Sequence, residues 1–214
     1  MSDTDALLPA PGRGQYDRQV PRQRRQAVQR ARLLSATAVV LASEPAPSVA
    51  SVIRVAGVGR NSFYEYFDHF EHARDALFVE LERWLIDALR AAEQSVRTPV
   101  EAFRSLAAAW FTLATEHPAQ WLALSGVAPT DTRPVSLAGI VFADALERAV
   151  SGFARRGVIA RPPDRVRAML VAAAAEALAR PLARAALASS GERRSNALER
   201  ARTLLVDTSV RLLH

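Results

Sequence analysis

The segment Ser48–Phe67, which reads SVASVIRVAGVGRNSFYEYF, constrains the fold more than any other part of the chain. Ser48 stands where a helix N-cap is expected, and the apolar residues after it supply one inward helix face. Gly57 then breaks that helix, because glycine adopts a positive φ at no steric cost. A second short helix is predicted from about Gly59 to Tyr66. Two short helices around a tight break form a helix-turn-helix, which presents its second helix to the DNA major groove.

The second helix of this segment is predicted to have two different faces. Phe63 and Phe67 stand one helical turn apart and are predicted to face the core. An outward face is left for contact with DNA. The side chains on that face are Arg60, Asn61, Ser62, Tyr64 and Glu65.

Composition predicts an all-α chain. Alanine fills 42 of the 214 positions, and alanine loses no side-chain entropy in a helix. No alternating run of β-branched residues indicates a strand. The sequence contains no cysteine, which excludes disulfides and thiolate-bound metal ions.

Positive charge is concentrated in the first third of the sequence. Residues 13–32 contain seven Arg and one Asp, which gives +6, and the net charge of the whole sequence is also +6. A concentrated basic segment fits a polyanionic partner, with a solvated basic tail as the alternative. We expect residues 1–20, where this segment begins, to form a disordered arm.

Apolar residues at three- and four-residue steps, with Pro and Gly between them, predict nine helices. Their approximate ranges are 22–43, 48–56, 59–66, 70–95, 99–116, 119–125, 135–155, 164–188 and 195–213. The first three are predicted to form a DNA-binding domain over residues 21–67. The other six are predicted to form an effector-binding and dimerisation domain over residues 68–214. Pro181 is expected to kink the eighth helix.

The chain resembles the tetracycline-repressor-like (TetR) family of bacterial transcription regulators. The residues that carry this resemblance, in their spacing, are Ser48-Val49, Val52-Ile53, Ala56-Gly57-Val58, Phe63-Tyr64 and Tyr66-Phe67. Farther along the chain the resemblance is one of architecture. It implies a ligand-responsive regulator without enzymatic activity or cofactor, a repressor that a small lipophilic effector releases from a near-palindromic operator.

Two positions depart from the family pattern. Ile53 stands where the family usually has Ala, so the helix crossing has to accommodate a larger side chain. Phe70 stands where the family tends to have a Lys that contacts phosphate. This second departure puts one contact with the DNA backbone in doubt.

By the resemblance, the second helix of the motif enters the major groove. Arg60 and Asn61 are expected to reach base edges, because Arg pairs with guanine and Asn with adenine. Ser62 is expected to contact bases or phosphate, Tyr64 and Tyr66 phosphate or sugar, and Ser48 phosphate. Arg22, Arg24 and Arg25 are expected to clamp the DNA backbone or a neighbouring groove from the disordered arm. Purely structural roles stay open for Ser48 as a cap and for Tyr66 as a core residue. The full predicted DNA-binding set is Ser48, Arg60, Asn61, Ser62, Tyr64, Tyr66, Arg22, Arg24 and Arg25.

Residues 70–160 are expected to hold the effector pocket. An apolar lining with few polar groups suits a lipophilic ligand, although ordinary core packing is the alternative for each aromatic residue. The ligand is expected to favour a state whose recognition helices are wrongly spaced for the operator. The candidate lining residues are Trp84, Phe103, Trp110, His117, Trp121 and Phe142.

A homodimer is expected to form through the last two helices, which would pair with their copies. A two-fold dimer places two recognition helices about 34–36 Å apart, which is one turn of DNA. No signal peptide or membrane span is indicated, so a cytoplasmic protein without a membrane partner is expected.

Two other functions stay open. An enzyme is weakly indicated by His69 and His72, which lie one turn apart near Asp68 and Asp75, but a third metal ligand is missing. No dinucleotide fingerprint, nucleophile elbow or phosphate loop is present, so no catalytic residue is predicted. The second alternative is a helical ligand-binding or interaction module without sequence-specific DNA binding. The two departures from the family pattern favour it.

Overall fold

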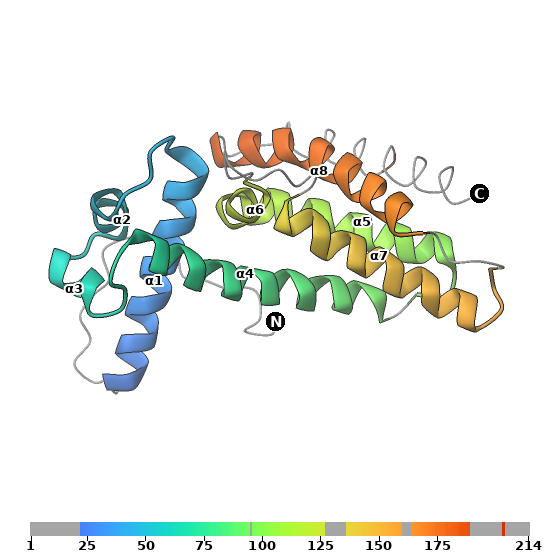
Figure 1. Cartoon of the computed structure of the whole chain (residues 1–214), viewed down its shortest axis with the longest axis horizontal. Helices are drawn as coiled ribbons and strands as arrows, with labels where there is room; N and C mark the ends of the chain where they lie inside the picture. The colour runs from blue at the N-terminus through green and yellow to red at the C-terminus, as the bar shows by residue number, and fades with distance from the viewer. Residues whose placement is uncertain (1–21, 95, 127–135, 160–163, 189–202, 204–214) are drawn as a thin grey trace. The chain divides into compact units, whose positions relative to one another are not determined.

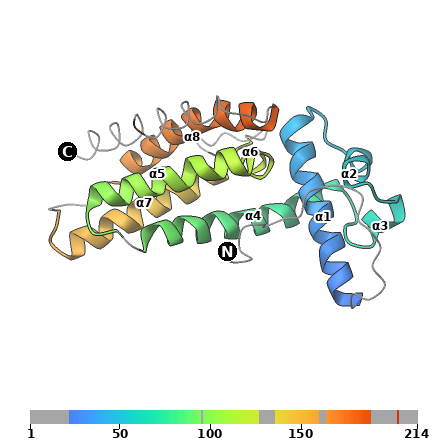
Figure 2. The ribbon, with the colours of Figure 1, turned by 180° about the vertical axis from the view of Figure 1, so that it is seen from behind.

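The computed structural model describes residues 22–94, 96–126, 136–159, 164–188 and 203. The described residues form α-helices and no strand (Figures 1 and 2). The all-α fold class is therefore confirmed. The helices are α1 (Arg22–Ser43), α2 (Val49–Ala56), α3 (Arg60–Tyr64), α4 (Phe70–Glu93), α5 (Pro99–Glu116), α6 (Pro118–Ser125), α7 (Leu137–Arg155) and α8 (Arg165–Ala188).

Most helix boundaries agree with the prediction to within one or two residues. Helix α7 begins two residues later than predicted, because Ser136 is its N-cap. The Ser136 hydroxyl accepts a hydrogen bond from the Gly139 N–H at 3.2 Å. The start of α5 has a complete capping box, in which Thr98 and Glu101 each accept from the other's backbone N–H. The predicted last helix, 195–213, lies outside the described residues apart from Thr203.

The chain divides into two compact units. The first ends at Leu81 and the second begins at Glu82, so the boundary falls within α4.

Unit 1 contains α1, α2, α3 and the first half of α4. Helices α1 and α2 pack together, and α2 also contacts α3. An ion pair joins α1 to α4, with Arg30 Nη1 3.2 Å from Glu80 Oε1. The apolar side chains that form the core of this unit are Leu33, Leu34, Val40, Val52, Phe63, Phe67, Leu77 and Leu81.

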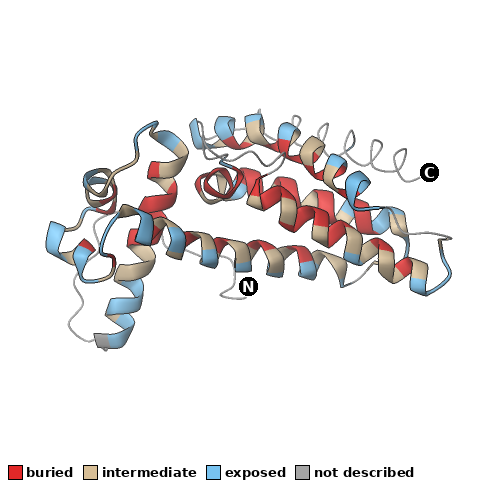
Figure 3. Cartoon of the chain, in the orientation of Figure 1, coloured by how far each residue is buried: buried red, intermediate tan, exposed pale blue. Residues whose placement is uncertain are grey.

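Unit 2 is a helix bundle in which α8 contacts α5, α6 and α7. The buried faces of α5, α6 and α7 are directed toward the bundle interior (Figure 3). Alanines recur along the buried side of α8, and their small side chains let neighbouring helices approach closely. These alanines are Ala168, Ala172, Ala175, Ala179 and Ala183. Helix α8 continues through Pro181, whose predicted kink stays a prediction.

No helix in the described part of the chain combines the length and the apolar character that a membrane span requires.

Candidate DNA-binding surface and interior aromatic cluster

Helix α2 is defined at both ends by local chemistry. Ser48 has an extended backbone, and its hydroxyl accepts a hydrogen bond from the Ser51 N–H at 3.2 Å. At the other end Gly57 adopts a left-handed conformation with φ 65°. This φ favours glycine because it has no side chain to clash with the backbone. The predicted cap and the predicted break are thus both present.

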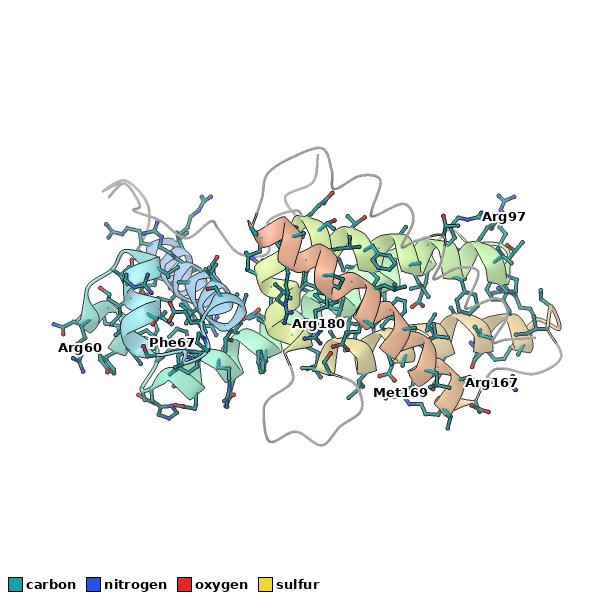
Figure 4. The ribbon with its side chains drawn as sticks, turned by 90° about the horizontal axis from the view of Figure 1, so that it is seen from above. Arg60, Phe67, Arg97, Arg167, Met169 and Arg180 are labelled. Atoms are coloured by element: carbon teal, nitrogen blue, oxygen red, sulfur yellow. The ribbon has the colours of Figure 1, made fainter. Side chains whose placement is uncertain are left out.

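Helix α3 buries Phe63 and exposes the adjacent Tyr64, and the two rings lie edge to face with centroids 5.5 Å apart. Phe63 has no exposed surface and Phe67 has 2%, and their ring centroids lie 5.6 Å apart. Tyr64 is 43% exposed. Figure 4 shows Arg60 projecting away from the helices of unit 1, with Phe67 among them. The buried pair therefore fixes which face of α3 points outward.

The outward face of α3 carries three of the predicted DNA contacts. Arg60, Asn61 and Tyr64 are exposed, and Ser62 is half-buried. The Arg60 guanidinium carbon lies 5.7 Å from the centre of the Tyr64 ring, within the range of a cation–π contact. The exposed face of α3 thus offers an amide, a guanidinium and a phenol to a partner.

Helix α3 ends at Tyr64, whereas the sequence pattern predicts that it continues to about Tyr66. The end of the helix tightens, because the Tyr66 N–H bonds to the Phe63 carbonyl at 3.0 Å, three residues back. Tyr66 is half-buried. Burial, and secondarily the negative charge of Glu65, raise the pKa of the Tyr66 phenol, so it stays protonated at neutral pH.

The predicted basic residues near the arm lie at the start of α1. Arg24 is exposed and Arg25 is half-buried, and both belong to the first turn of the helix. Arg22 is the first helical residue, and its side chain is outside the described part of the structure. Any clamp made by these residues would therefore come from helix α1 and not from a disordered arm.

Two ion pairs of unit 1 were missed by the sequence reasoning. Arg54 on α2 lies 2.6 Å from Glu44. Arg30 pairs with Glu80 and also lies with its guanidinium carbon 5.9 Å from the centre of the Phe67 ring. A link between residues fifty positions apart leaves no signal in a single sequence.

The two atypical positions are both half-buried. Ile53 lies within α2, and its carbonyl accepts from the Gly57 N–H that caps the helix. Phe70 is the first residue of α4. The helix-turn-helix geometry accommodates both side chains.

The two histidines at the start of α4 lie near separate carboxylates. His69 Nδ1 is 3.3 Å from Glu71, and His72 Nδ1 is 3.3 Å from Asp68. No cluster of three or more His, Cys, Asp or Glu suited to a metal ion occurs among the described residues.

The predicted effector residues fall into two groups in unit 2. Trp110 lies at the centre of the first, with its ring centroid 5.3 Å from Trp121 and 4.6 Å from Phe142. All three are at least 99% buried, and Phe103 is buried on the same helix as Trp110. The second group is a pair of half-buried rings, Trp84 and His117, with centroids 5.2 Å apart. The first group is the interior aromatic cluster of the bundle.

A buried polar cluster joins α6, α7 and α8 and was missed by the sequence reasoning. Glu176, whose side chain is 7% exposed, forms an ion pair with Arg180 on α8. Its other carboxylate oxygen accepts from the Ser136 hydroxyl at 2.8 Å. Arg180 also donates to the Ser125 carbonyl at 2.6 Å. These contacts join the end of α6 and the start of α7 to the middle of α8.

No protein-family model and no curated protein matches this chain. Solved structures do match it across most of its length. A TetR-like transcriptional regulator from Rhodococcus sp. RHA1 aligns with 90% of this chain and 97% of its own, at 17% identity and a TM-score of 0.66.

Two further solved structures are similar to this chain. The transcriptional regulator FadR from Bacillus subtilis in complex with stearoyl-CoA covers 85% of this chain and 98% of its own, at 15% identity and a TM-score of 0.65. A gamma-butyrolactone receptor, described as ArpA-like, covers 89% of this chain and 98% of its own, at 17% identity and a TM-score of 0.54. The chain thus has the fold of TetR-family transcriptional regulators.

Proposed function

We propose that this protein is a DNA-binding transcriptional regulator that responds to a small molecule. The observation that carries the proposal is the two-sided helix α3. Phe63 anchors it in the core of unit 1, while Arg60, Asn61 and Tyr64 face solvent. A short helix that follows a tight break and exposes such side chains is suited to the major groove.

The exposed residues of α3 divide into two proposed roles. Arg60 and Asn61 read base edges, since each can form two hydrogen bonds with one base. Ser62 contacts a base or phosphate, while Tyr64 and Tyr66 hold phosphate or sugar and so position the helix without reading sequence. The half-buried phenol of Tyr66 stays neutral, so no negative charge opposes the phosphate.

Other proposed contacts fix the protein on the DNA backbone. Ser48 caps α2 with its hydroxyl, which leaves its backbone N–H at the helix N-terminus for phosphate. Arg22, Arg24 and Arg25 supply positive charge at the start of α1. Phosphate contacts of this kind strengthen binding to all DNA sequences alike.

The effector site is proposed to lie in unit 2, around the interior aromatic cluster. The similar structures support this proposal, because one is of a complex with stearoyl-CoA and another is of a gamma-butyrolactone receptor. A lipophilic effector matches the buried rings of Trp110, Trp121 and Phe142. The effector would favour a state that holds the operator poorly, which makes the protein a repressor released by its ligand.

A homodimer through α8 and the predicted last helix completes the proposal. Helix α8 exposes apolar side chains that an isolated chain would leave in water, namely Val166 (67% exposed), Leu170 (55%) and Leu187 (38%). A two-fold dimer would bring two α3 helices to a near-palindromic operator. Light scattering at micromolar concentration should give a dimer, and Leu170→Asp should shift it toward monomer.

DNA binding is tested with fluorescence anisotropy on labelled promoter DNA from beside the protein's own gene. The wild-type chain should prefer this DNA over a scrambled duplex of equal length. Arg60→Ala and Asn61→Ala should each weaken specific binding roughly tenfold or more, because a bidentate base contact contributes about 1–3 kcal/mol of discrimination. Arg104→Ala, which removes an exposed Arg of α5, is the matched control and should leave affinity unchanged.

Equal affinity for promoter and scrambled DNA would contradict the proposal. That result would favour a helical ligand-binding or interaction module without sequence-specific DNA binding. An effect of Arg104→Ala as large as that of Arg60→Ala would show that α3 has no special role.

A further inference from the structure

Two neighbouring tryptophans in unit 2 differ in one hydrogen bond. Trp110 and Trp121 are both fully buried and lie edge to face. The Trp110 indole N–H donates to the Ala175 carbonyl on α8 at 3.1 Å. The Trp121 indole N–H is also buried, yet it has no hydrogen-bond partner among the described residues.

A buried N–H without an acceptor destabilises the folded protein, because it has lost water and gained nothing in return. Most buried polar groups in folded proteins are satisfied, so an unsatisfied group needs a specific explanation. Indole nitrogen is a donor only, and the group that satisfies it has to be an acceptor. The missing partner of the Trp121 N–H is therefore a hydrogen-bond acceptor.

The Arg180–Glu176 ion pair contacts α6, the helix that carries Trp121, and its two charges are already balanced. Ser125, one helical turn after Trp121 on α6, gives its carbonyl to Arg180. Arg180 in turn pairs with Glu176, whose second oxygen is held by Ser136. Figure 4 labels Arg180 on α8.

Because the charges of Arg180 and Glu176 already neutralise each other, a charged ligand at this site is disfavoured. An anion would be repelled by Glu176 and would have to compete with it for Arg180. A cation would meet the guanidinium of Arg180 instead. Removing either charged ligand from water would be costly without a free counter-charge. The aromatic surroundings of Trp121 thus favour an uncharged molecule.

We infer that the Trp121 indole N–H is the hydrogen-bond donor to the effector, and that the effector is an uncharged, largely apolar molecule with an oxygen acceptor, such as a ketone, ester or lactone. This inference rests on the proposed effector site in unit 2. It adds the atom that recognises the ligand and the charge state of the ligand itself. Trp110, already bonded to Ala175, orients the Trp121 ring through their edge-to-face contact.

The test uses nuclear magnetic resonance of the full chain labelled with ¹⁵N. Its three tryptophans give three indole N–H signals, which Trp84→Phe, Trp110→Phe and Trp121→Phe assign by elimination. Three ten-carbon probes are titrated separately: decan-2-one, decanoate and decylammonium. Decan-2-one should move the Trp121 signal downfield in a saturable way, as expected when this N–H gains an acceptor. Decanoate and decylammonium should bind at least about tenfold more weakly than the ketone.

A second measurement compares the affinity of variants for decan-2-one by isothermal titration calorimetry. Trp121→Phe keeps an aromatic ring but removes the donor, and it should weaken binding roughly tenfold, the size of one neutral hydrogen bond. Phe153→Leu is the control, because it removes a buried ring that lies three helical turns beyond Phe142 along α7. It should destabilise the fold while leaving ketone affinity unchanged.

Three results would overturn the inference: an unmoved Trp121 signal at saturating ketone, decanoate binding as tightly as the ketone, or unchanged ketone affinity in Trp121→Phe. If Trp121→Phe fails to fold, the signal shift in the wild-type chain still decides. No DNA is present in either measurement. A protein that binds the ketone but not promoter DNA would therefore disprove the proposed regulator while leaving this inference intact.

Discussion

The proposed DNA-binding face of unit 1 and the interior of unit 2 are organised over very different distances along the chain. In unit 1, the contacts that define α2 and the buried side of α3 join residues three or four positions apart, such as Ser48 with Ser51 and Phe63 with Phe67. In unit 2, interior contacts join residues 40 to 65 positions apart, as in Ser136 with Glu176 and Trp110 with Ala175. The first region follows from local chemistry, whereas the second exists only when the bundle has assembled.

The largest expected effect tests whether α3 depends on its single buried anchor. Phe63→Ala should lower the free energy of unfolding by about 4 kcal/mol, because it removes a fully buried ring and leaves a cavity. The neighbouring exposed residue provides the control, and Tyr64→Ala should cost under about 1 kcal/mol. Urea unfolding measures both. Similar losses for the two variants would mean that α3 is not anchored from one side.

The next effect tests the long-range organisation of unit 2. Arg180→Met leaves the carboxylate of Glu176 buried without its cation, and the loss should be about 3 kcal/mol of unfolding free energy. Adding Glu176→Leu removes that stranded charge and should recover part of the loss. Chemical denaturation of the single and double variants measures this coupling. Additive losses would show that the two side chains do not act as a pair.

A smaller effect separates the two roles of Ser48. Ser48→Ala removes the cap of α2 and should cost about 1 kcal/mol of stability. Ser48→Asp keeps a capping oxygen, so its stability should stay near that of the wild type. If phosphate approaches this helix end, the added negative charge of Ser48→Asp should weaken DNA binding more than Ser48→Ala does. DNA affinities in the opposite order would place phosphate elsewhere.

The smallest effect is a pH dependence in unit 1. The pKa of Tyr66 is raised in the folded state by burial and by Glu65. The stability linked to this proton is fully present below the unfolded pKa of about 10 and is lost as pH rises through the folded pKa. Thermal unfolding across this range should show a steeper decline for the wild type than for Tyr66→Phe. The chain has no lysine to titrate in the same window. Parallel declines would contradict the raised pKa.

The sequence predicts those features of the fold whose causes are local. A Ser before an apolar run, a Gly after it and two Phe residues one turn apart are sufficient to place α2, the break and the buried side of α3. The family resemblance was carried by the same residues. The sequence pattern predicts an end of α3 that is about two residues too late. The reason is that the Tyr66 N–H bonds to the Phe63 carbonyl, three residues back, and not to the carbonyl four residues back as in a regular α-helix.

The polar cluster of unit 2 could not be predicted for a physical reason. Glu176 and Arg180 stand four residues apart on a helix, a spacing usually found in exposed ion pairs. Their burial depends on Ser125 and Ser136, which come from two other helices. Likewise, the sequence indicates that Trp110 and Trp121 are candidates for the apolar interior. It does not indicate which of the two indole N–H groups has a hydrogen-bond acceptor.

Pro181 has a consequence for hydration of the exposed side of α8. Proline has no N–H, so the Ala177 carbonyl lacks the donor that a helix normally supplies four residues later. Ala177 and Pro181 are both exposed, which allows solvent to bond this oxygen. A second copy packed over this face would have to bring a donor to the Ala177 oxygen or keep a water molecule there. The proposed dimer interface would then hold a water molecule at this point. On either side of it, near Leu170 and Leu187, the apolar side chains can exclude water.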